Sequence, residues 1–262
     1  MKNISKMAIC TTTFLRNLLA FDTIQSIQSQ LSENCILLVA DQNKDNNRIN
    51  QNPNWHYTTV YNLEYDIGLS AGRNYLVNKA SDLNCDYCII SADSIKFTNK
   101  YDFRPMIDFL ESNPKYAKIG FNLENRQNFT YDLEISPKHN KFIVIKPRQA
   151  MISGKLGDYQ PCDLCCNFCL VKTAILKEIP WDNELGLCEH EDHSYRLKQA
   201  GYKTFWTDSI SAEYINNKPP EYDVMRKRLY GEFKDKLKKK YNLDPFGSWL
   251  IYNHKLPIDE QL

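Results

Sequence analysis

The 262-residue sequence has no long apolar run, and the longest obvious one extends only from Cys35 to Ala40. A membrane-spanning helix needs about 20 such residues, so we expect no membrane span. The first residues, MKNISKMAICTTT, also lack the apolar stretch of a secretory signal. We therefore expect a cytoplasmic protein, for which any membrane contact would be peripheral.

The chain also lacks an excess of charge of either sign. Lys and Arg total 33 against 32 for Asp and Glu, which gives a formal net charge of +1. No global field selects nucleic acid, so we expect no nucleic-acid partner. Hydrophobic residues make up 42% and charged residues 25%, proportions that are typical of a globular protein and argue against wholesale disorder.

Cysteine, in contrast, is abundant, with nine residues. Six have C-x-x-C spacing, and the pairs are Cys85 with Cys88, Cys162 with Cys165, and Cys166 with Cys169. Without an export signal, reduced thiols are expected rather than disulfides. Two such pairs would suit a structural zinc ion. The two segments that contain these pairs, residues 85–93 and 162–171, have the pattern of buried strands, however. In a strand, residues three apart face opposite sides of the sheet. We favour buried thiols and keep zinc as the alternative.

Apolar strand patterns alternate with helical patterns through the first half of the chain. The expected strands are 7–12, 35–40, 55–60, 87–91 and 118–121, and the expected helices are 15–29, 70–79 and 103–111. This order predicts an α/β protein with a parallel-rich sheet and helices on both faces. In such sheets, ligands bind beyond the carboxyl ends of the strands. The polar residues at these ends are Thr11, Thr12, Thr13, Asp41 and Asp93.

The second half has a different rhythm. The segments FTYDLEI and KFIVIKP predict two antiparallel strands joined by a turn. A helix at 189–200, a strand at 202–206 and a charged helix at 221–240 follow. We expect one domain over residues 1–218 and a basic helical extension over 219–262. The basic end of that extension would either be a solvated surface or contact anionic lipid.

Residues 67–74, IGLSAGRN, have the composition of a phosphate-binding turn. Gly68 and Gly72 permit a tight turn and a close approach of the backbone to a ligand. Arg73 offers a fork of donors suited to a diphosphate, and a helix that begins here adds its N-terminal dipole. The alternative is an ordinary helix start with a surface arginine.

Two further strand ends carry single carboxylates. Asp41 would accept hydrogen bonds from a ring N–H or a ribose hydroxyl, or act as a turn residue. Asp93, between Ala92 and Ser94, is the only carboxylate of its segment. A divalent cation that bridges a diphosphate usually needs more oxygen ligands than one side chain supplies. A capping role is the alternative for Asp93.

The densest group of titratable residues is EHEDH, residues 189–193. Crowded carboxylates and histidines perturb one another's proton affinities, and one of them would serve as a general base. His190 and His193 lack the HExxH spacing of a zinc protease. The alternative is a set of acids attracted by the dipole at a helix start.

Five segments together resemble GT-A glycosyltransferases of the family 2 type. In chain order they are TTTFLR, LLVADQN, GLSAGRN, IISADSIKF and NFCLVKTAILKEIPWDNELGLCEHEDHSYRLKQAGYK. The similarity covers residues 7–215 and is closest to the β-1,4-N-acetylgalactosaminyltransferase group that includes the ganglioside-forming enzymes. It implies a GT-A fold with a mixed, mostly parallel sheet flanked by helices. It also implies inverting transfer of a hexose or N-acetylhexosamine from a UDP-sugar to a hydroxyl of a glycan or glycolipid acceptor.

The resemblance implies roles for individual residues. Donor-binding residues would be Thr11, Thr13, Arg16, Asp41, Gly72, Arg73, Ala92, Asp93 and Ser94. Asn167 and Phe168 would lie by the donor sugar, and Trp181 and Asp182 near the acceptor. Asp192 would be the catalytic base, with Glu189 and Glu191 beside it.

Two departures from that family concern the metal. The acidic triplet retains only Asp93, and Glu213 or Tyr214 stands where a metal-binding histidine is common. A Mn²⁺ or Mg²⁺ ion at Asp93 and a metal-free mechanism, in which Arg16, Arg73 or a lysine opposes the diphosphate, are equal alternatives. A non-catalytic nucleotide-sugar-binding or zinc-binding protein on the same fold is the other functional alternative, against which the intact EHED cluster argues.

Overall fold

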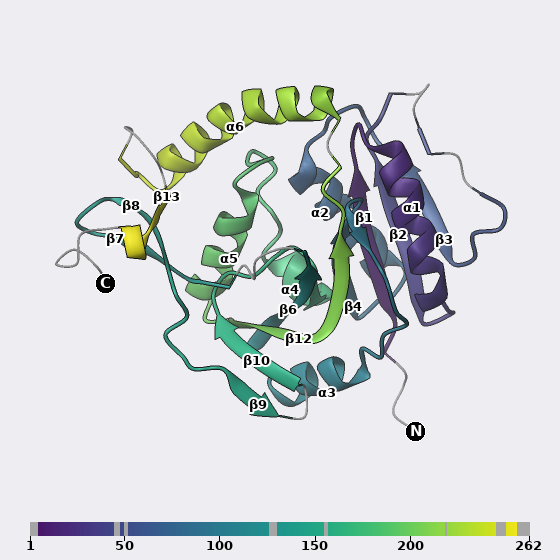
Figure 1. The fold of residues 1–262 in the computed structure, drawn as a ribbon, viewed down its shortest axis with the longest axis horizontal. Coiled ribbons are helices and arrows are strands. Elements are labelled where there is room, and N and C mark those ends of the chain that lie inside the picture. The colour runs from purple at the N-terminus through teal and green to yellow at the C-terminus, as the bar shows by residue number, and fades with distance from the viewer. Residues whose placement is uncertain are drawn as a thin grey trace.

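The centre of the protein is a ten-stranded mixed sheet, seen in a computed structural model (Figure 1). The structure describes residues 5–44, 48–49, 52–125, 130–154, 157–217, 219–244 and 250–255. The strands of this sheet are β1 Met7–Thr13, β2 Cys35–Asp41, β3 Thr58–Asn62, β4 Tyr87–Ala92, β5 Ile95–Lys96, β6 Tyr116–Glu124, β9 Ile152–Gly154, β10 Gly157–Cys162, β11 Cys169–Lys172 and β12 Lys203–Tyr214. They follow the order β3-β2-β1-β4-β11-β6-β12-β10-β9, and β5 pairs with β12.

The first four strands of this order are parallel and their ends are in register. β1 pairs with β2 and β4, and Thr13 lies opposite Asp41 while Thr12 lies opposite Ala92. These strands are apolar along most of their length because both of their faces are buried. The register therefore brings the polar residues that follow each strand to one edge of the sheet.

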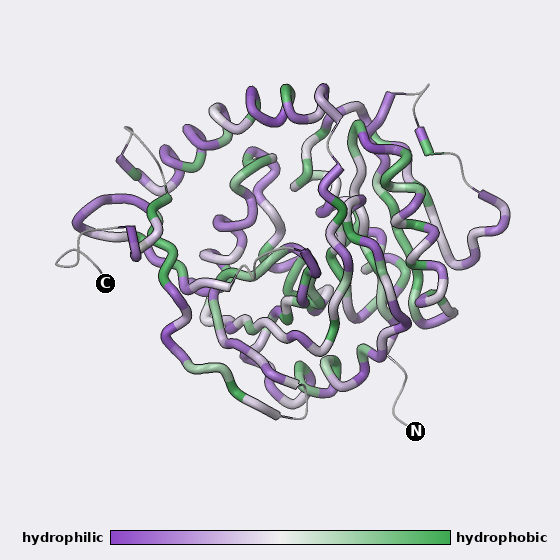
Figure 2. Tube along the Cα trace, viewed as in Figure 1, coloured by the Kyte–Doolittle hydropathy of each residue, from purple (hydrophilic) through white to green (hydrophobic). Residues whose placement is uncertain are grey.

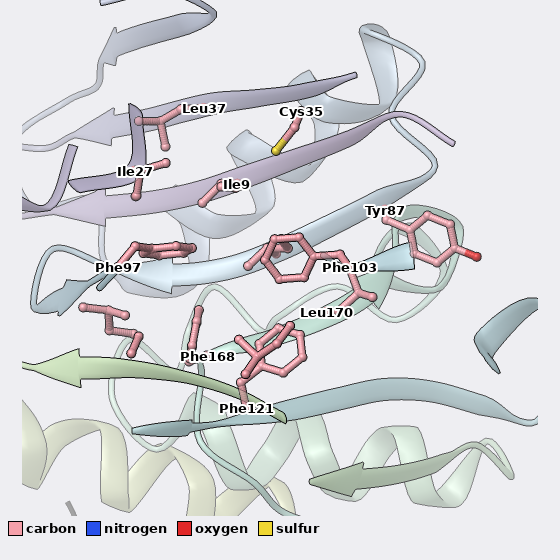
Figure 3. Close-up of a cluster of buried hydrophobic side chains, with 14 of the residues drawn as sticks. Ile9, Ile27, Cys35, Leu37, Tyr87, Phe97, Phe103, Phe121, Phe168 and Leu170 are labelled. Atoms are coloured by element: carbon pink, nitrogen blue, oxygen red, sulfur yellow. The ribbon is translucent and has the colours of Figure 1, made fainter. Parts of the chain in front are cut away.

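Helices cover both faces of the sheet, which confirms the predicted α/β architecture. α1 (Asn17–Ile27) and α3 (Arg104–Ser112) pack on one face, and α2 (Leu69–Asp82) and α4 (Thr173–Glu178) on the other. The core beneath α1 and α3 is rich in aromatic rings, including Phe103, Phe121 and Phe168 (Figure 3).

A second, three-stranded sheet lies to one side. It contains β7 (Asp132–Ser136), β8 (Lys141–Ile145) and β13 (Leu250–Tyr252), and β7 and β8 form the predicted antiparallel pair. Its apolar residues share a core with Leu237 of α6, the helix Pro220–Lys240. α6 arches along the top of Figure 1, from the second sheet toward α2, and many of its residues are hydrophilic (Figure 2). In the described part of the chain, no helix is both long and apolar enough to cross a membrane.

The expectation of continuous strands at the C-x-x-C pairs was wrong. β10 ends at Cys162 and β11 begins at Cys169, so that Cys165 and Cys166 lie in the connecting loop. This loop is buried because Leu164 pairs with Tyr131 and the thiol of Cys165 fills the space above Gly120. All nine cysteines are buried free thiols. Within the described ranges, no three His, Cys, Asp or Glu side chains gather as a metal site.

Two predicted strand boundaries also needed correction. The strand expected from residue 55 begins at Thr58, because Trp55 turns into the core beside α1. The strand expected at 202–206 continues to Tyr214, because β12 pairs in turn with β6 and then β5.

Candidate functional site

The polar cluster beyond β1 and β4 is built around Asp93. Its carboxylate is fully buried and forms an ion pair with Arg16, the residue that precedes α1. The Thr23 hydroxyl donates to the Asp93 carbonyl at 2.8 Å and fixes the turn after β4. Burial raises the pKa of Asp93 to about 6, although the charge of Arg16 and the nearby Thr13 hydroxyl and Phe14 N–H lower it. The structure thus brings together Thr13, Arg16 and Asp93, for which a role in donor binding stays a prediction.

Asp41 organises the loop that follows β2. One of its oxygens accepts from the backbone N–H of Asn43 at 2.9 Å, and the other accepts from the Ile49 N–H at 2.6 Å. These are the contacts of a turn residue, and a role for Asp41 beside a nucleotide base stays a prediction.

The next residue, Gln42, connects the Asp41 loop to the start of α2. Its amide oxygen accepts from the Gly68 N–H at 3.1 Å, where a φ of 91° requires glycine. A side chain at Gly72 would come within 2.7 Å of the Gln42 amide nitrogen. The two glycines therefore allow α2 to start close against the loop after β2.

Arg73 links the start of α2 to a second cluster on α5, the helix Glu189–Gln199. Its side chain is only 3% exposed, and its Nη1 lies 2.8 Å from Oε1 of Glu189. The guanidinium also lies over the ring of Trp181, 5.4 Å from its centre. This ion pair joins the glycine-containing turn to the acidic cluster, two motifs that are far apart in the sequence.

Asn167 connects the same arginine to His190. In the amide orientation that satisfies its neighbours, its oxygen accepts from Arg73 at 3.0 Å and its nitrogen lies 2.7 Å from Nδ1 of His190. His190 was not predicted individually to be a site residue, although its position between Glu189 and Glu191 was a usable signal.

Phe168, which follows Asn167, does not join this group. It is fully buried and packs edge-on against Phe121 and Phe97 (Figure 3).

Asp192 is completely buried and both of its oxygens are engaged. Oδ1 accepts from the Tyr241 hydroxyl at 2.8 Å and lies 2.7 Å from Lys240 Nζ, while Oδ2 accepts from Arg196 Nε at 2.9 Å. Lys240 also binds Asp182 at 2.6 Å. The end of α6 therefore closes over two predicted site residues, and one lysine of its basic end makes internal contacts.

Glu191 is partly exposed, whereas the carboxylates of Glu189 and Asp192 are buried. Burial raises the pKa of Glu191 to about 7, against the effect of its own backbone N–H and with a smaller contribution from the nearby charge of Glu189. The carboxyl is thus close to half-ionised at neutral pH.

His193, on the inner side of α5, is stacked on Trp181 with ring centres 4.5 Å apart. Its Nε2 lies 3.0 Å from the Ile179 carbonyl, and burial holds its pKa well below the usual range. These contacts make His193 part of the packing around the site.

Neither the models of known protein families nor the sequences of curated proteins match this chain. Several solved structures are similar to this chain in fold. A mannosyltransferase from Pyrobaculum calidifontis in complex with GDP-Man and Mn²⁺ superposes with a TM-score of 0.61 at 11% identity. GalNAc-T7 with UDP, GalNAc and Mn²⁺ gives 0.60 at 12% identity. Residues 1–349 of S. aureus TarS in complex with UDP give 0.54 at 13% identity.

These similarities cover nearly the whole of this chain, namely 95%, 93% and 97% in the same order. The chain spans 66%, 56% and 76% of the three proteins. At such low identity they establish the fold, which is that of the GT-A glycosyltransferases.

Proposed function

We propose that this protein is an inverting glycosyltransferase that uses a UDP-sugar donor and a glycan hydroxyl as acceptor. The observation that carries the proposal is the buried ion pair between Arg73 and Glu189. It connects the strand-end edge, where α/β sheets bind nucleotides, to the acidic start of α5, where burial raises the pKa of Glu191. Donor and base would thereby belong to one site. The three similar structures are described with GDP-Man or UDP, which supports a nucleotide donor.

In the proposed reaction, the acceptor oxygen attacks the anomeric carbon while the nucleoside diphosphate leaves from the opposite face. A carboxylate in the first turn of α5 takes the acceptor proton. The resemblance assigns this role to Asp192. For Asp192 to accept a proton, Lys240 and Tyr241 must first withdraw from its Oδ1.

Glu191 is the second candidate base, on the strength of one observation. A pKa of about 7 lets a carboxyl exchange protons efficiently near neutral pH, and Glu191 is partly exposed. If Glu191 is the base, turnover rises as the pH passes through about 7, because only the carboxylate accepts a proton.

A panel of nucleotide sugars tests the proposal. Thermal melts in the presence of UDP-hexoses, UDP-N-acetylhexosamines and GDP-mannose would identify the donor, since a bound ligand raises apparent stability by mass action. Release of the nucleoside diphosphate in the presence of glycan acceptors would then measure turnover. A protein that no nucleotide stabilises would contradict the proposal.

Two matched variants locate the base. Removing it is expected to lower turnover by about 10²–10⁴-fold while donor binding survives. Asp192→Asn and Glu191→Gln are compared with Asp108→Asn and Glu33→Gln, which change exposed carboxylates elsewhere. If donor binds but neither the wild type nor any variant turns over with any acceptor, the alternative of a non-catalytic nucleotide-sugar-binding protein is preferred.

A further inference from the structure

The residues beyond β4 do not fit a divalent cation. Mn²⁺ or Mg²⁺ at a diphosphate takes about six oxygen ligands, and one carboxylate with water is a poor set. Asp93 is the only carboxylate of its triplet, and it is already paired with Arg16. Ala212 and Tyr214 of β12 pack into the core with Ile95. Glu213 lies between them in the strand, so it belongs to the opposite face of the sheet from these core residues. No step of the proposed reaction is therefore assigned to a metal ion.

Arg16 follows β1 at the carboxyl edge of the sheet, which is where α/β sheets bind ligands. Its guanidinium is held by Asp93 on one side and lies 4.3 Å from the centre of the Tyr222 ring of α6 on another. Its side chain is 11% exposed, and its Nε is buried with no hydrogen-bond partner among the described residues. A buried donor without a partner is unfavourable, and a phosphate oxygen would satisfy it.

A second unsatisfied group lies on the adjoining strand. Thr11 is fully buried, and in the described part of the chain its hydroxyl also has no hydrogen-bond partner. It is two residues before Thr13, and hence on the same face of β1 as the residue that contacts Asp93. This edge of the sheet thus holds two donors that suit a phosphate oxygen, Arg16 Nε and the Thr11 hydroxyl. Thr13 Oγ1 and the two carboxylate oxygens of Asp93 are also buried there without a hydrogen bond among the described residues.

We propose that the guanidinium of Arg16, held in place by Asp93, takes the place of the divalent cation and binds the diphosphate of the donor directly. The inference rests on the proposed function and adds to it the means of charge neutralisation. Asp93 is then a positioning residue for Arg16 rather than a metal ligand. Donor binding consequently requires no metal ion.

Calorimetric titration of the full chain with UDP tests this without any substitution. The titration is run in EDTA, in Mg²⁺ and in Mn²⁺, and the three dissociation constants are expected to agree within about twofold. Binding that occurs only with a metal ion, or that tightens tenfold or more on its addition, would overturn the inference while leaving the proposed function intact. Absence of binding by both UDP and GDP under every condition would overturn both.

Substitution of Arg16 provides an independent measurement. Loss of a charge-assisted hydrogen bond is worth about 1.5–3 kcal/mol, so Arg16→Gln should weaken UDP binding by about 10–100-fold. Uridine, which has no phosphate, should bind as before. Arg16→Lys should recover part of the loss, and Arg104→Gln, which changes an exposed arginine paired with Asp102, should have no effect.

Equal weakening of UDP and uridine would show that Arg16 acts only on the fold, and would overturn the inference. If Arg16→Gln does not fold, the metal titration of the wild-type chain still decides between the two outcomes.

Discussion

Glu191→Gln is expected to stabilise the protein above neutral pH. In the folded state, burial raises the pKa of this carboxyl from 4.5 to about 7, so ionisation of Glu191 opposes folding. The stability associated with the protonated form is fully present below pH 4.5 and is lost as the pH rises through about 7. Glutamine has nearly the same shape and stays neutral, so the variant does not incur this loss.

The magnitude follows from the change in proton affinity. Each tenfold change is worth about 1.4 kcal/mol, so the difference between 4.5 and about 7 corresponds to about 3 kcal/mol. For a domain of this size, 1 kcal/mol shifts the melting temperature by about 2–4 °C. The variant should therefore melt about 6–12 °C above the wild type at pH 8 and at nearly the same temperature at pH 4.

Thermal melts of both proteins from pH 4 to pH 8 measure this difference directly. Subtracting the wild-type curve cancels the other titrating groups, and the exposed control Glu33→Gln should show no pH-dependent gain. A Glu191→Gln protein that melts with or below the wild type throughout this range would refute the assignment of a partly buried carboxyl with a raised pKa. Retention of such a costly group would be consistent with a functional role.

Three further predictions concern a close-packed glycine, the Arg73–Glu189 ion pair and the cysteines. Gly186→Ala should destabilise the protein by about 1–3 kcal/mol, because the new methyl would come within 2.7 Å of the Phe233 ring, and hydrogen exchange should show faster opening of α6. Arg73→Ala should lower stability by about 3–5 kcal/mol in urea unfolding by leaving Glu189 buried without its partner, and Arg73→Ala with Glu189→Gln should recover part of that loss. EDTA should leave the melting temperature unchanged, because the nine cysteines are buried free thiols, whereas a large drop together with one zinc per chain would contradict this.

Local sequence pattern was sufficient for much of the architecture. The apolar segments of β1, β2 and β4 are each bounded by polar residues and separated by helical periodicity, and this is enough to predict parallel strands with helices on both faces. The polar strand ends then meet at one edge because parallel strands start and finish together. The acidic start of α5 was also visible, since acids are favoured at a helix N-terminus.

The partners of the charged residues could not be predicted in the same way. Asp93 forms an ion pair with Arg16, and Asp192 is covered by Lys240 and Tyr241. Both contacts depend on how α1 and α6 pack against distant strands and helices. Periodicity reports which face of an element is buried, but it carries no information about which distant side chain meets it there.

The loop that contains Cys165 shows the same limit. An apolar run buried by its neighbours has the same composition whether it is a strand or a loop. Between Cys162 and Cys169 the described chain forms one isolated bridge, Leu164 with Tyr131, and this single bridge does not continue β10 as a strand. The positions and types of most elements are thus local properties of the chain, whereas the end of a buried strand such as β10 is set by its pairing partners. The ionisation and accessibility of the site residues arise only when those elements pack, because desolvation and charge pairing depend on distances between segments that are remote in sequence.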